Sequence, residues 1–448
     1  MSELSELGAS IALRAEDGEQ VEVYAVRSHD TEIEVFDGEV ESLSVASVEG
    51  LGVRVVTGQR QGYAWCGSLD PMAIQETLGE ARDNAEFSVR DEWVGLAAPG
   101  DVDWAAPPLD LFRAELSSVP TDDKVTFALD LERATRTADQ RVRGVEAAGY
   151  GDSVLETAVV SSLGVSASTR RTTCSAHAFA IAGEGADTQT GAGFAVGRSF
   201  AELDVAKIAE DAATRAVRLL GARQPRSRRL PVLFDPLVTG SLVALVGLAC
   251  SGEAVTKGRS MFVDRLGEAV AAAGVTLVDD PTLPDATGAS PHDGEGVPTR
   301  RNALIEGGVL GAFLHNTYTG RRSGRGTTGS AVRGFKSVPG VGSRALFLEP
   351  GRRTPEEIMA SVPEALYVQS VSGLHSGTNI VSGDFSVGAE GLVVRDGEFA
   401  EPVREVTIAS TLPRMLLDIV EVGGDLEWLP GGAAGQTLLV SEMTLSGS

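Results

Sequence analysis

Histidine occurs only five times in this 448-residue sequence, so the positions of the histidines limit its metal and proton-transfer chemistry. His292 is followed by Asp293 and, after one more residue, by Glu295. A His-Asp-x-Glu cluster supplies imidazole and carboxylate donors of the kind that bind divalent metals. An exposed acidic loop ahead of Pro298 is the simpler explanation of the same residues, and we favour it.

The other four histidines offer less. His29 lies in a predicted turn, and His177 lies in a predicted strand, where a hydrogen-bonded structural role is expected. His315 ends a predicted strand, and His375 opens a glycine-rich segment that also contains Asp384. A metal site of relocated ligands around His292, His315 and His375 is therefore an alternative for which the sequence provides no positional support.

A locally basic, glycine-rich segment covers residues 319–336, TGRRSGRGTTGSAVRGFK. Its guanidinium groups could pair with carboxylates, because arginine presents a planar fork of donors and glycine lets the backbone adapt to a partner. A solvated flexible loop explains the composition equally well. The arginines concerned are Arg321, Arg322, Arg325 and Arg333. The segment is no phosphate-binding loop, because no Gly-Lys-Ser/Thr follows at the required spacing, and no serine lies in the turn of a serine hydrolase.

Composition describes the chain that must position these residues. Apolar residues make up 42% of the sequence, and the formal net charge is −25. The charge disfavours contact with phosphate backbones, so we expect no nucleic acid partner. Three cysteines without paired spacing indicate a reducing compartment, and the N-terminus lacks the apolar stretch of a signal peptide. A cytoplasmic protein with no membrane partner is predicted.

Periodicity predicts an α+β fold in two domains. Strand-like alternation between residues 21 and 65 is followed by helices that begin near Pro71 and Thr121, more strands, and a helix at 205–220. The basic, proline-containing sequence at 223–231 is the predicted boundary. The domains are 1–224, an antiparallel sheet with helices, and 225–448, which is strand-rich and barrel-like. A helix from Pro236 belongs to the second domain, and hairpin turns are predicted at Asp37-Gly38 and Asp396-Gly397.

Residues 374–405, LHSGTNIVSGDFSVGAEGLVVRDGEFAEPVRE, contain a Gly-Asp-Phe-Ser turn, an Asp-Gly hairpin and a closing Pro-Val-Arg-Glu. The string resembles the C-terminal hallmark of the TldD/PmbA (TldE) family of metallopeptidase subunits, sometimes called modulators of DNA gyrase. The resemblance covers essentially the whole chain and is strongest at 255–314 and 373–428. It implies that Arg321, Arg322, Arg325 and Arg333, together with His375, Asp384 and Phe385, lie near a subunit interface or bind peptide.

Catalytic members of this family carry a zinc-binding HExxxH helix, and this chain has none. Counting back without gaps from Lys257-Gly258 places the histidine positions on Val243 and Leu248 and the glutamate position on Ala244. The cysteine ligand near the C-terminus is also missing, because no cysteine follows Cys250. The resemblance therefore implies a subunit of the TldE/PmbA type without catalytic residues or a metal of its own.

The function implied is that of a non-catalytic partner in a TldD-like zinc metallopeptidase complex that cleaves unfolded or small peptides. Zinc would reside in the catalytic subunit, and this chain would contribute chamber wall, interface and peptide-binding backbone, with residues 383–394 as a place for strand addition. We expect a heterodimer with the catalytic subunit or a homodimer. The alternatives are a stand-alone homodimeric binding or scaffold protein and the metallopeptidase with relocated ligands.

Overall fold

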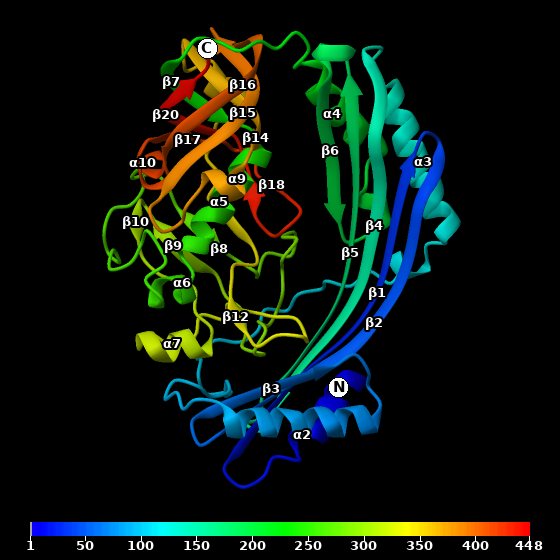
Figure 1. The fold of residues 1–448 in the computed structure, drawn as a ribbon, viewed down its shortest axis with the longest axis vertical. Coiled ribbons are helices and arrows are strands. Elements are labelled where there is room, and N and C mark those ends of the chain that lie inside the picture. Colours follow the sequence, from blue (N-terminus) through cyan, green and yellow to red (C-terminus); the bar gives the residue numbers. More distant parts are fainter. Residues whose placement is uncertain (1) are drawn as a thin grey trace.

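The computed structural model describes residues 2–448 and has the expected α+β architecture, with an antiparallel sheet in its first half and a closed barrel in its second (Figure 1). The first sheet has six strands in the order β3-β2-β1-β4-β5-β6. Their bounds are β1 (Glu19–Phe36), β2 (Glu39–Thr57), β3 (Arg60–Cys66), β4 (Val142–Ser161), β5 (Ser166–Ala182) and β6 (Gln189–Gly197). Strands of up to 20 residues make this sheet long and curved.

Alternation along these strands sends successive side chains to opposite faces, and helices cover one face only. The odd-numbered residues Val21 and Val23 of β1 pack beneath the first two helices, whereas Ile33 packs beneath the next two. These helices are α1 (Glu3–Ala12), α2 (Pro71–Phe87), α3 (Thr121–Thr137) and α4 (Val205–Val217). Even-numbered residues such as Glu22 and Tyr24 point to the other face, against which the second half of the chain packs.

The second half contains a five-stranded barrel built around β7. Its sheet runs β16-β15-β14-β7-β20-β17. A further pairing of β16 with β20 closes β16, β15, β14, β7 and β20 into a ring, and β17 is a sixth strand that pairs with β20 outside it. These strands are β7 (Arg228–Phe234), β14 (Glu364–Ser372), β15 (Asp384–Arg395), β16 (Glu398–Thr411), β17 (Ile419–Val422) and β20 (Leu438–Ser446). Side chains from the barrel strands and from α5 (Pro236–Ala249) form one continuous apolar core.

Short elements surround the barrel. The strands are β8 (Leu277–Asp279), β9 (Asn302–Glu306), β10 (Val309–Leu310), β11 (Ala331–Val332), β12 (Gly340–Val341), β13 (Leu346–Leu348), β18 (Glu427–Trp428) and β19 (Ala434–Gly435). The helices are α6 (Gly252–Thr256), α7 (Thr317–Ser323), α8 (Pro355–Met359), α9 (Leu374–Gly377) and α10 (Leu412–Leu417). Among residues 2–448, no helix combines the length and apolarity that a bilayer crossing requires.

The predicted hairpin turns are confirmed. Asp37 and Gly38 join β1 to β2 with φ of 50° and 81°, the left-handed conformation that a two-residue Asp-Gly turn requires. Asp396 and Gly397 join β15 to β16 in the same way, with φ of 52° and 84°. The predicted turn at His29 is wrong, because β1 continues through this residue and pairs there with both β2 and β4.

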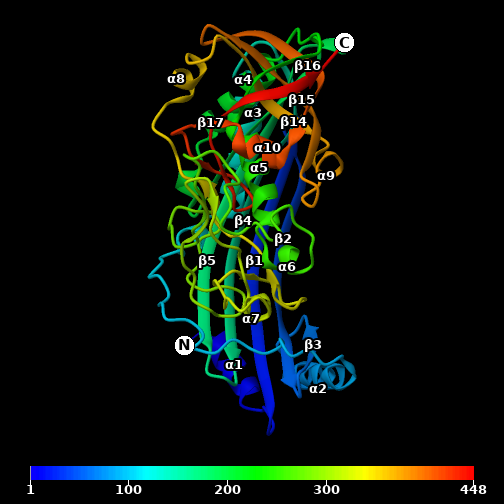
Figure 2. The ribbon, with the colours of Figure 1, turned by 90° about the vertical axis from the view of Figure 1, so that its left-hand side faces the viewer.

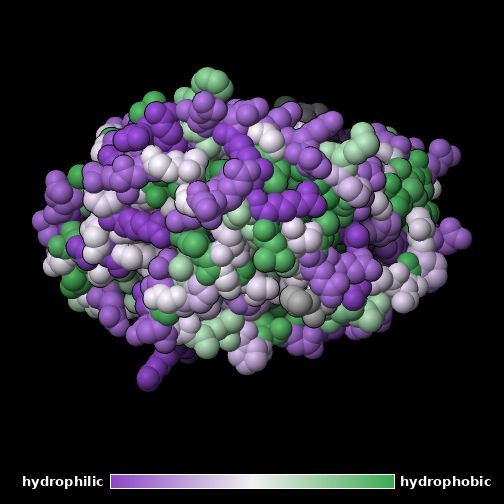
Figure 3. All heavy atoms as spheres, turned by 90° about the horizontal axis from the view of Figure 1, so that it is seen from below, coloured by the Kyte–Doolittle hydropathy of each residue, from purple (hydrophilic) through white to green (hydrophobic). Residues whose placement is uncertain are grey.

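A connecting segment, residues 88–113, ties the two halves together between α2 and the third helix. Its backbone carbonyl of Leu96 accepts a 2.7 Å hydrogen bond from Arg321, and the Trp104 indole donates to the carbonyl of Pro298. Figure 2 looks onto the second half of the chain, behind which the long strands extend toward α1 and α2. Seen from the end that carries α1 and α2, the surface shows hydrophilic residues with hydrophobic residues scattered among them (Figure 3).

Candidate functional site

Helix α5 carries the three positions that were predicted to correspond to the zinc site of the catalytic family members. The residue before it, Asp235, is held by several hydrogen bonds and an ion pair. The buried Asp235 carboxylate accepts a hydrogen bond from the Leu237 amide and pairs with Arg215 at 2.9 Å and with the Tyr367 hydroxyl at 2.6 Å. This network orients the helix because it satisfies an amide at the helix start and neutralises the buried carboxylate. The helix then presents a buried face to the barrel core.

The three predicted positions on α5 do not fit a zinc site. Val243 is 4% exposed and belongs to the barrel core, whereas Ala244 is exposed and Leu248 is 56% exposed. None of these side chains has a lone pair, so none could ligate zinc or activate water. Cys250 follows the helix as a buried free thiol whose pKa burial raises to about 12. Within residues 2–448, no three histidine, cysteine, aspartate or glutamate side chains gather as a metal site would require.

The histidines that could have formed a relocated site lie in different surroundings. His315 is 2% exposed, and burial together with the charge of Arg325 lowers its pKa to about 4. Its Nδ1 lies 3.2 Å from the Thr319 hydroxyl. His292 is half-buried with its pKa lowered by burial, and His375 is exposed on α9. The exposed acidic loop predicted ahead of Pro298 is wrong, because Asp293 and Glu295 are 4% and 1% exposed. Glu295 pairs with Arg54 of the first half at 3.1 Å, whereas Asp293 accepts hydrogen bonds from three backbone amides of its own half.

The four predicted arginines separate into three environments. Arg321 on α7 binds the connecting segment through Leu96 and lies 3.6 Å from Asp101. Arg322 and Arg325 are exposed. The side chain of Arg333 is completely buried, and its Nη1 lies 2.5 Å from Glu22 of β1. One short segment therefore contains a surface loop and a residue of the interface between the two halves.

The predicted residues of the glycine-rich segment also lie in different environments. Asp384 is exposed at the start of β15 and accepts a hydrogen bond from the Ser382 hydroxyl. Phe385 is 1% exposed and packs in the barrel core, so its ring serves stability. The suggestion that β15 binds a peptide by strand addition is wrong for this structure. Residues 388–395 of β15 pair with β14 while β16 occupies its other side, so no free edge remains there.

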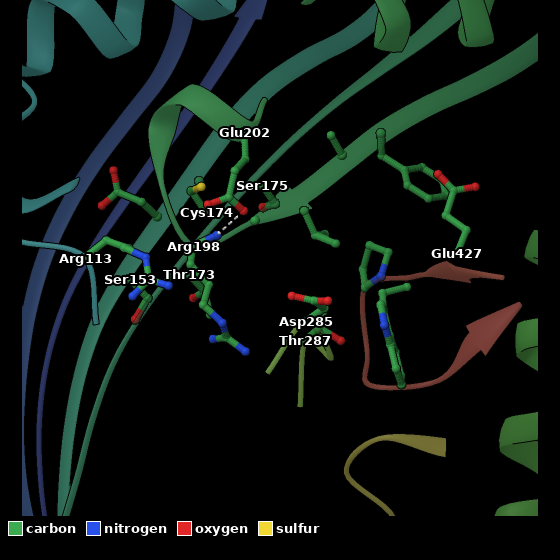
Figure 4. Close-up of a pocket in the computed structure, with 18 of the residues that line it drawn as sticks. Arg113, Ser153, Thr173, Cys174, Ser175, Arg198, Glu202, Asp285, Thr287 and Glu427 are labelled. Carbon is green, nitrogen blue, oxygen red and sulfur yellow. Dashed lines mark hydrogen bonds between the residues drawn. The ribbon is translucent and has the colours of Figure 1, made fainter. Parts of the chain in front are cut away.

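A cleft between the two halves is a candidate site, with a volume of about 830 Å³ (Figure 4). Strands β1, β4, β5 and β6 form one wall, with Ser153, Thr173 and Ser175 among its residues. The opposite wall includes Asp285, Thr287 and Glu427 from the second half. A cavity of this size between domains is typical of a binding site for part of a peptide or for a small molecule.

Two titratable groups at the wall of the cleft formed by the strands are held in their protonated forms. Cys174 is buried, and its pKa is raised to about 12 by burial and by the charges of Glu202 and Asp152, so its thiol stays protonated and poorly nucleophilic. Behind this wall Asp152 is neutralised by Lys124 at 2.5 Å and accepts a 2.7 Å hydrogen bond from Tyr150. The Tyr150 pKa is raised by burial and by that carboxylate. No activated nucleophile therefore faces the cleft from these residues.

Unpaired acids give the cleft its charge. Asp30, Glu32 and Asp285 line it without an ion pair to any residue of 2–448. Three basic residues, Arg113, Arg198 and Lys207, line it as well, and Arg198 donates hydrogen bonds to the backbone carbonyls of Pro284 and Ala286. The cleft can therefore hold a cationic or hydrogen-bonding group. Sequence analysis missed this site, whose only sequence signal is the polar alternation of the strands.

Comparison with known proteins identifies the family of the chain. Models of the PmbA/TldA metallopeptidase family match residues 21–85 as the first domain, 114–220 as the central domain and 227–447 as the C-terminal domain. The chain belongs to this metallopeptidase family. It is 30% identical over 412 residues to the metalloprotease PmbA of Escherichia coli O157:H7, covering 92% of this chain and 88% of that protein. It is also 27% identical to a PmbA homologue of Haemophilus influenzae, over 98% and 95% of the two chains.

Solved structures share the fold over nearly the whole length. A Thermotoga maritima protein, solved as a candidate modulator of a DNA gyrase, matches with a TM-score of 0.91 at 25% identity, covering 98% of this chain and 99% of that one. TldE from Thermococcus kodakarensis matches with a TM-score of 0.89 at 24% identity and 99% coverage of both chains. This second likeness concerns the fold.

Proposed function

We propose that the chain is a non-catalytic partner subunit in a peptidase complex of the PmbA/TldA family. The observation that carries the proposal is α5, where aliphatic side chains occupy the predicted zinc-site positions in a chain of a metallopeptidase family. The catalytic subunit would supply zinc, ligands and base. This chain would supply part of the chamber wall through the acidic cleft, which suits a polypeptide segment with basic or polar groups.

An unpaired edge of β2 supports a partner protein. Residues 39–49 pair with β1 on one side only, because β3 pairs with β2 from residue 51 onward. All of these residues are exposed, including the apolar side chains of Val40, Leu43, Val45 and Val48. A long, apolar, unpaired edge is the kind of surface that natural proteins cover with another chain. We commit to a catalytic relative of the same fold as the occupant, with a second copy of this chain in its absence.

The cytoplasm is the proposed location. The three cysteines Cys66, Cys174 and Cys250 are free, which suits a reducing compartment.

The test begins with the chain purified alone and then mixed with a relative from the same genome that carries HExxxH. Light scattering should give a dimer alone and a one-to-one complex in the mixture. Metal analysis should find zinc only where the relative is present, and cleavage of unfolded casein should require the relative. Stoichiometric zinc in this chain alone would favour relocated ligands, and failure of the two chains to associate would favour the stand-alone binding protein.

Edge variants connect that test to the structure. Val45→Lys should weaken association because it places a charge on the β2 edge, where Val45 is 50% exposed. Val89→Lys is the matched control, because Val89 is 87% exposed outside the edge. Equal association of the two variants would refute the assignment of the edge as the interface.

A further inference from the structure

A second, smaller cavity of about 150 Å³ lies between the sheet and the second half of the chain, separate from the acidic cleft. Strands β1, β4 and β5 line one side, and residues 290–294 with Arg333 and Arg344 line the other. The volume is below the range typical of drug-sized ligands, so the cavity suits a small group or the end of a larger molecule.

Two of the guanidinium groups that line this cavity form no ion pair within the described chain. Arg171 of β5 and Arg344 both line it, and neither forms an ion pair with any residue of 2–448. Burial and the like charges of Arg344 and Arg198 lower the pKa of Arg171. Like charges facing one another in a partly desolvated space are unfavourable unless an anion joins them.

Several buried polar atoms without a hydrogen-bond partner among residues 2–448 belong to residues that line the same cavity. Arg333 also lines the cavity, and its side chain is 0% exposed. Its Nη1 pairs with Glu22, whereas its Nε has no hydrogen-bond partner. The buried Nε of Arg344 and the Nδ1 of His292 also lack partners. Buried polar groups are nearly always paired in native proteins, so several orphaned groups around one cavity indicate a missing acceptor.

One carboxylate lines the cavity, and it is already occupied. Asp293 accepts hydrogen bonds from the amides of Glu295 and Val297 on Oδ1 and from the amide of Ala331 on Oδ2. It lies beyond ion-pair distance of Arg171 and Arg344. Asp293 therefore shapes the loop and forms no ion pair with Arg171 or Arg344, although the charge of Arg344 acts on its pKa. Arg344 itself donates a hydrogen bond from Nη2 to the carbonyl of Ala331 at 3.1 Å, and the chain as a whole has a formal charge of −25.

We propose that this cavity is an oxyanion-binding site in which Arg171 and Arg344 hold a carboxylate or phosphate group, with Arg333 and His292 beside it. Arginine is suited to the task because its fork of donors matches the two oxygens of such a group. Thr173 of the acidic cleft lies only two residues along β5 from Arg171, a rise of roughly 7 Å. The carboxylate could be the C-terminus of a peptide bound in the cleft, and this source rests on the proposed function. A free anion such as phosphate is the other source, and it does not depend on the proposed function.

Calorimetric titration of the chain alone tests the site with three probes: acetyl-trialanine with a free C-terminus, the same peptide as its amide, and inorganic phosphate, with chloride held constant. Binding of the free acid but not the amide identifies a peptide carboxylate, and binding of phosphate identifies a free anion. Arg171→Met and Arg344→Met should each weaken binding about tenfold or more. Arg170→Met is the matched control, because adjacent strand residues face opposite ways and Arg170 stacks on Phe112 instead.

The melting temperature without ligand distinguishes an anion-binding Arg171 from an arginine whose role is purely structural. Arg171→Met should melt at or above the temperature of the unaltered chain, because it removes a cation that has no partner. Lower stability of that variant would show that the protein already neutralises Arg171, and would overturn the proposal. So would absence of binding by all three probes, or equal binding by Arg171→Met and Arg170→Met. Peptidase activity of a mixed complex does not enter this test, so it can fail independently of the proposed function.

Discussion

Replacing Arg54 by Met should destabilise the protein more than any exposed arginine substitution, because Arg54 joins the two halves within a buried charge cluster. Its Nε and Nη2 donate to Glu22 at 3.0 and 2.7 Å, and Nη2 also donates to Glu295 at 3.1 Å. The Arg54 side chain is 4% exposed, and the two carboxylates are 1% and 0% exposed. Because these carboxylates have lost nearly all contact with water, their negative charges are stabilised mainly by the guanidinium groups.

The magnitude follows from what remains after the substitution. Glu22 keeps Arg333, whereas Glu295 keeps only the amide of Thr317 at 2.7 Å and loses its cation. Removing one member of a buried ion pair costs about 3–5 kcal/mol, because the remaining charge stays desolvated. Adding Glu295→Gln to the variant should restore part of that loss, because the amide carries no charge.

Urea unfolding followed by circular dichroism measures the effect at neutral pH. Arg133→Met is the control, because Arg133 pairs with Asp130 on the surface at 72% exposure and should matter by less than about 1 kcal/mol. Equal losses for the Arg54 and Arg133 variants would refute the reasoning. A lack of recovery on adding Glu295→Gln would show that the stranded carboxylate is not the cause.

Two further predictions concern α5 and pH. Introducing Val243→His, Ala244→Glu and Leu248→His together should create neither zinc binding nor casein cleavage, and nearly all of the stability loss, about 1–3 kcal/mol, should come from the buried Val243; zinc-dependent turnover with unchanged stability would contradict this. Burial raises the pKa of Asp279 to about 6, and burial with the charge of Glu295 raises that of Asp293 to about 7. The folded protein therefore binds protons that the unfolded chain does not, so the contribution of these two groups to stability is present at low pH and is lost as pH rises through 6 and 7. Urea midpoints between pH 5 and 8 measure this trend, and Asp279→Asn should flatten its lower part.

Local signals in the sequence predicted most of the elements, because turn chemistry and alternation act over a few residues. The Asp-Gly pairs at 37–38 and 396–397 set hairpins that the structure contains. The error at His29 arose because Arg27-Ser-His-Asp has the composition of a turn, whereas pairing with β2 and β4 on both sides holds it extended. The β15 suggestion failed for a similar reason: whether a strand has a free edge depends on neighbours distant in sequence.

The site was less predictable than the fold. Arg322 and Arg333 belong to one basic segment, yet the first is exposed and the second is buried against Glu22, 311 residues away. Local composition could not separate them. The cavity lined by Arg171 and Arg344 combines residues from both halves, so it exists only once the two halves have packed.

The connecting segment at 88–113 has a consequence for the order of folding. It leaves the first sheet after α2, packs on the second half through Arg321 and Pro298, and returns to the sheet at Thr172. These contacts join residues about two hundred positions apart, and closing such long loops slows folding. During synthesis the first sheet is thus completed long before the surface that covers its inner face. In that interval its long strands depend on their helices alone, and a chaperone could act on them most usefully then.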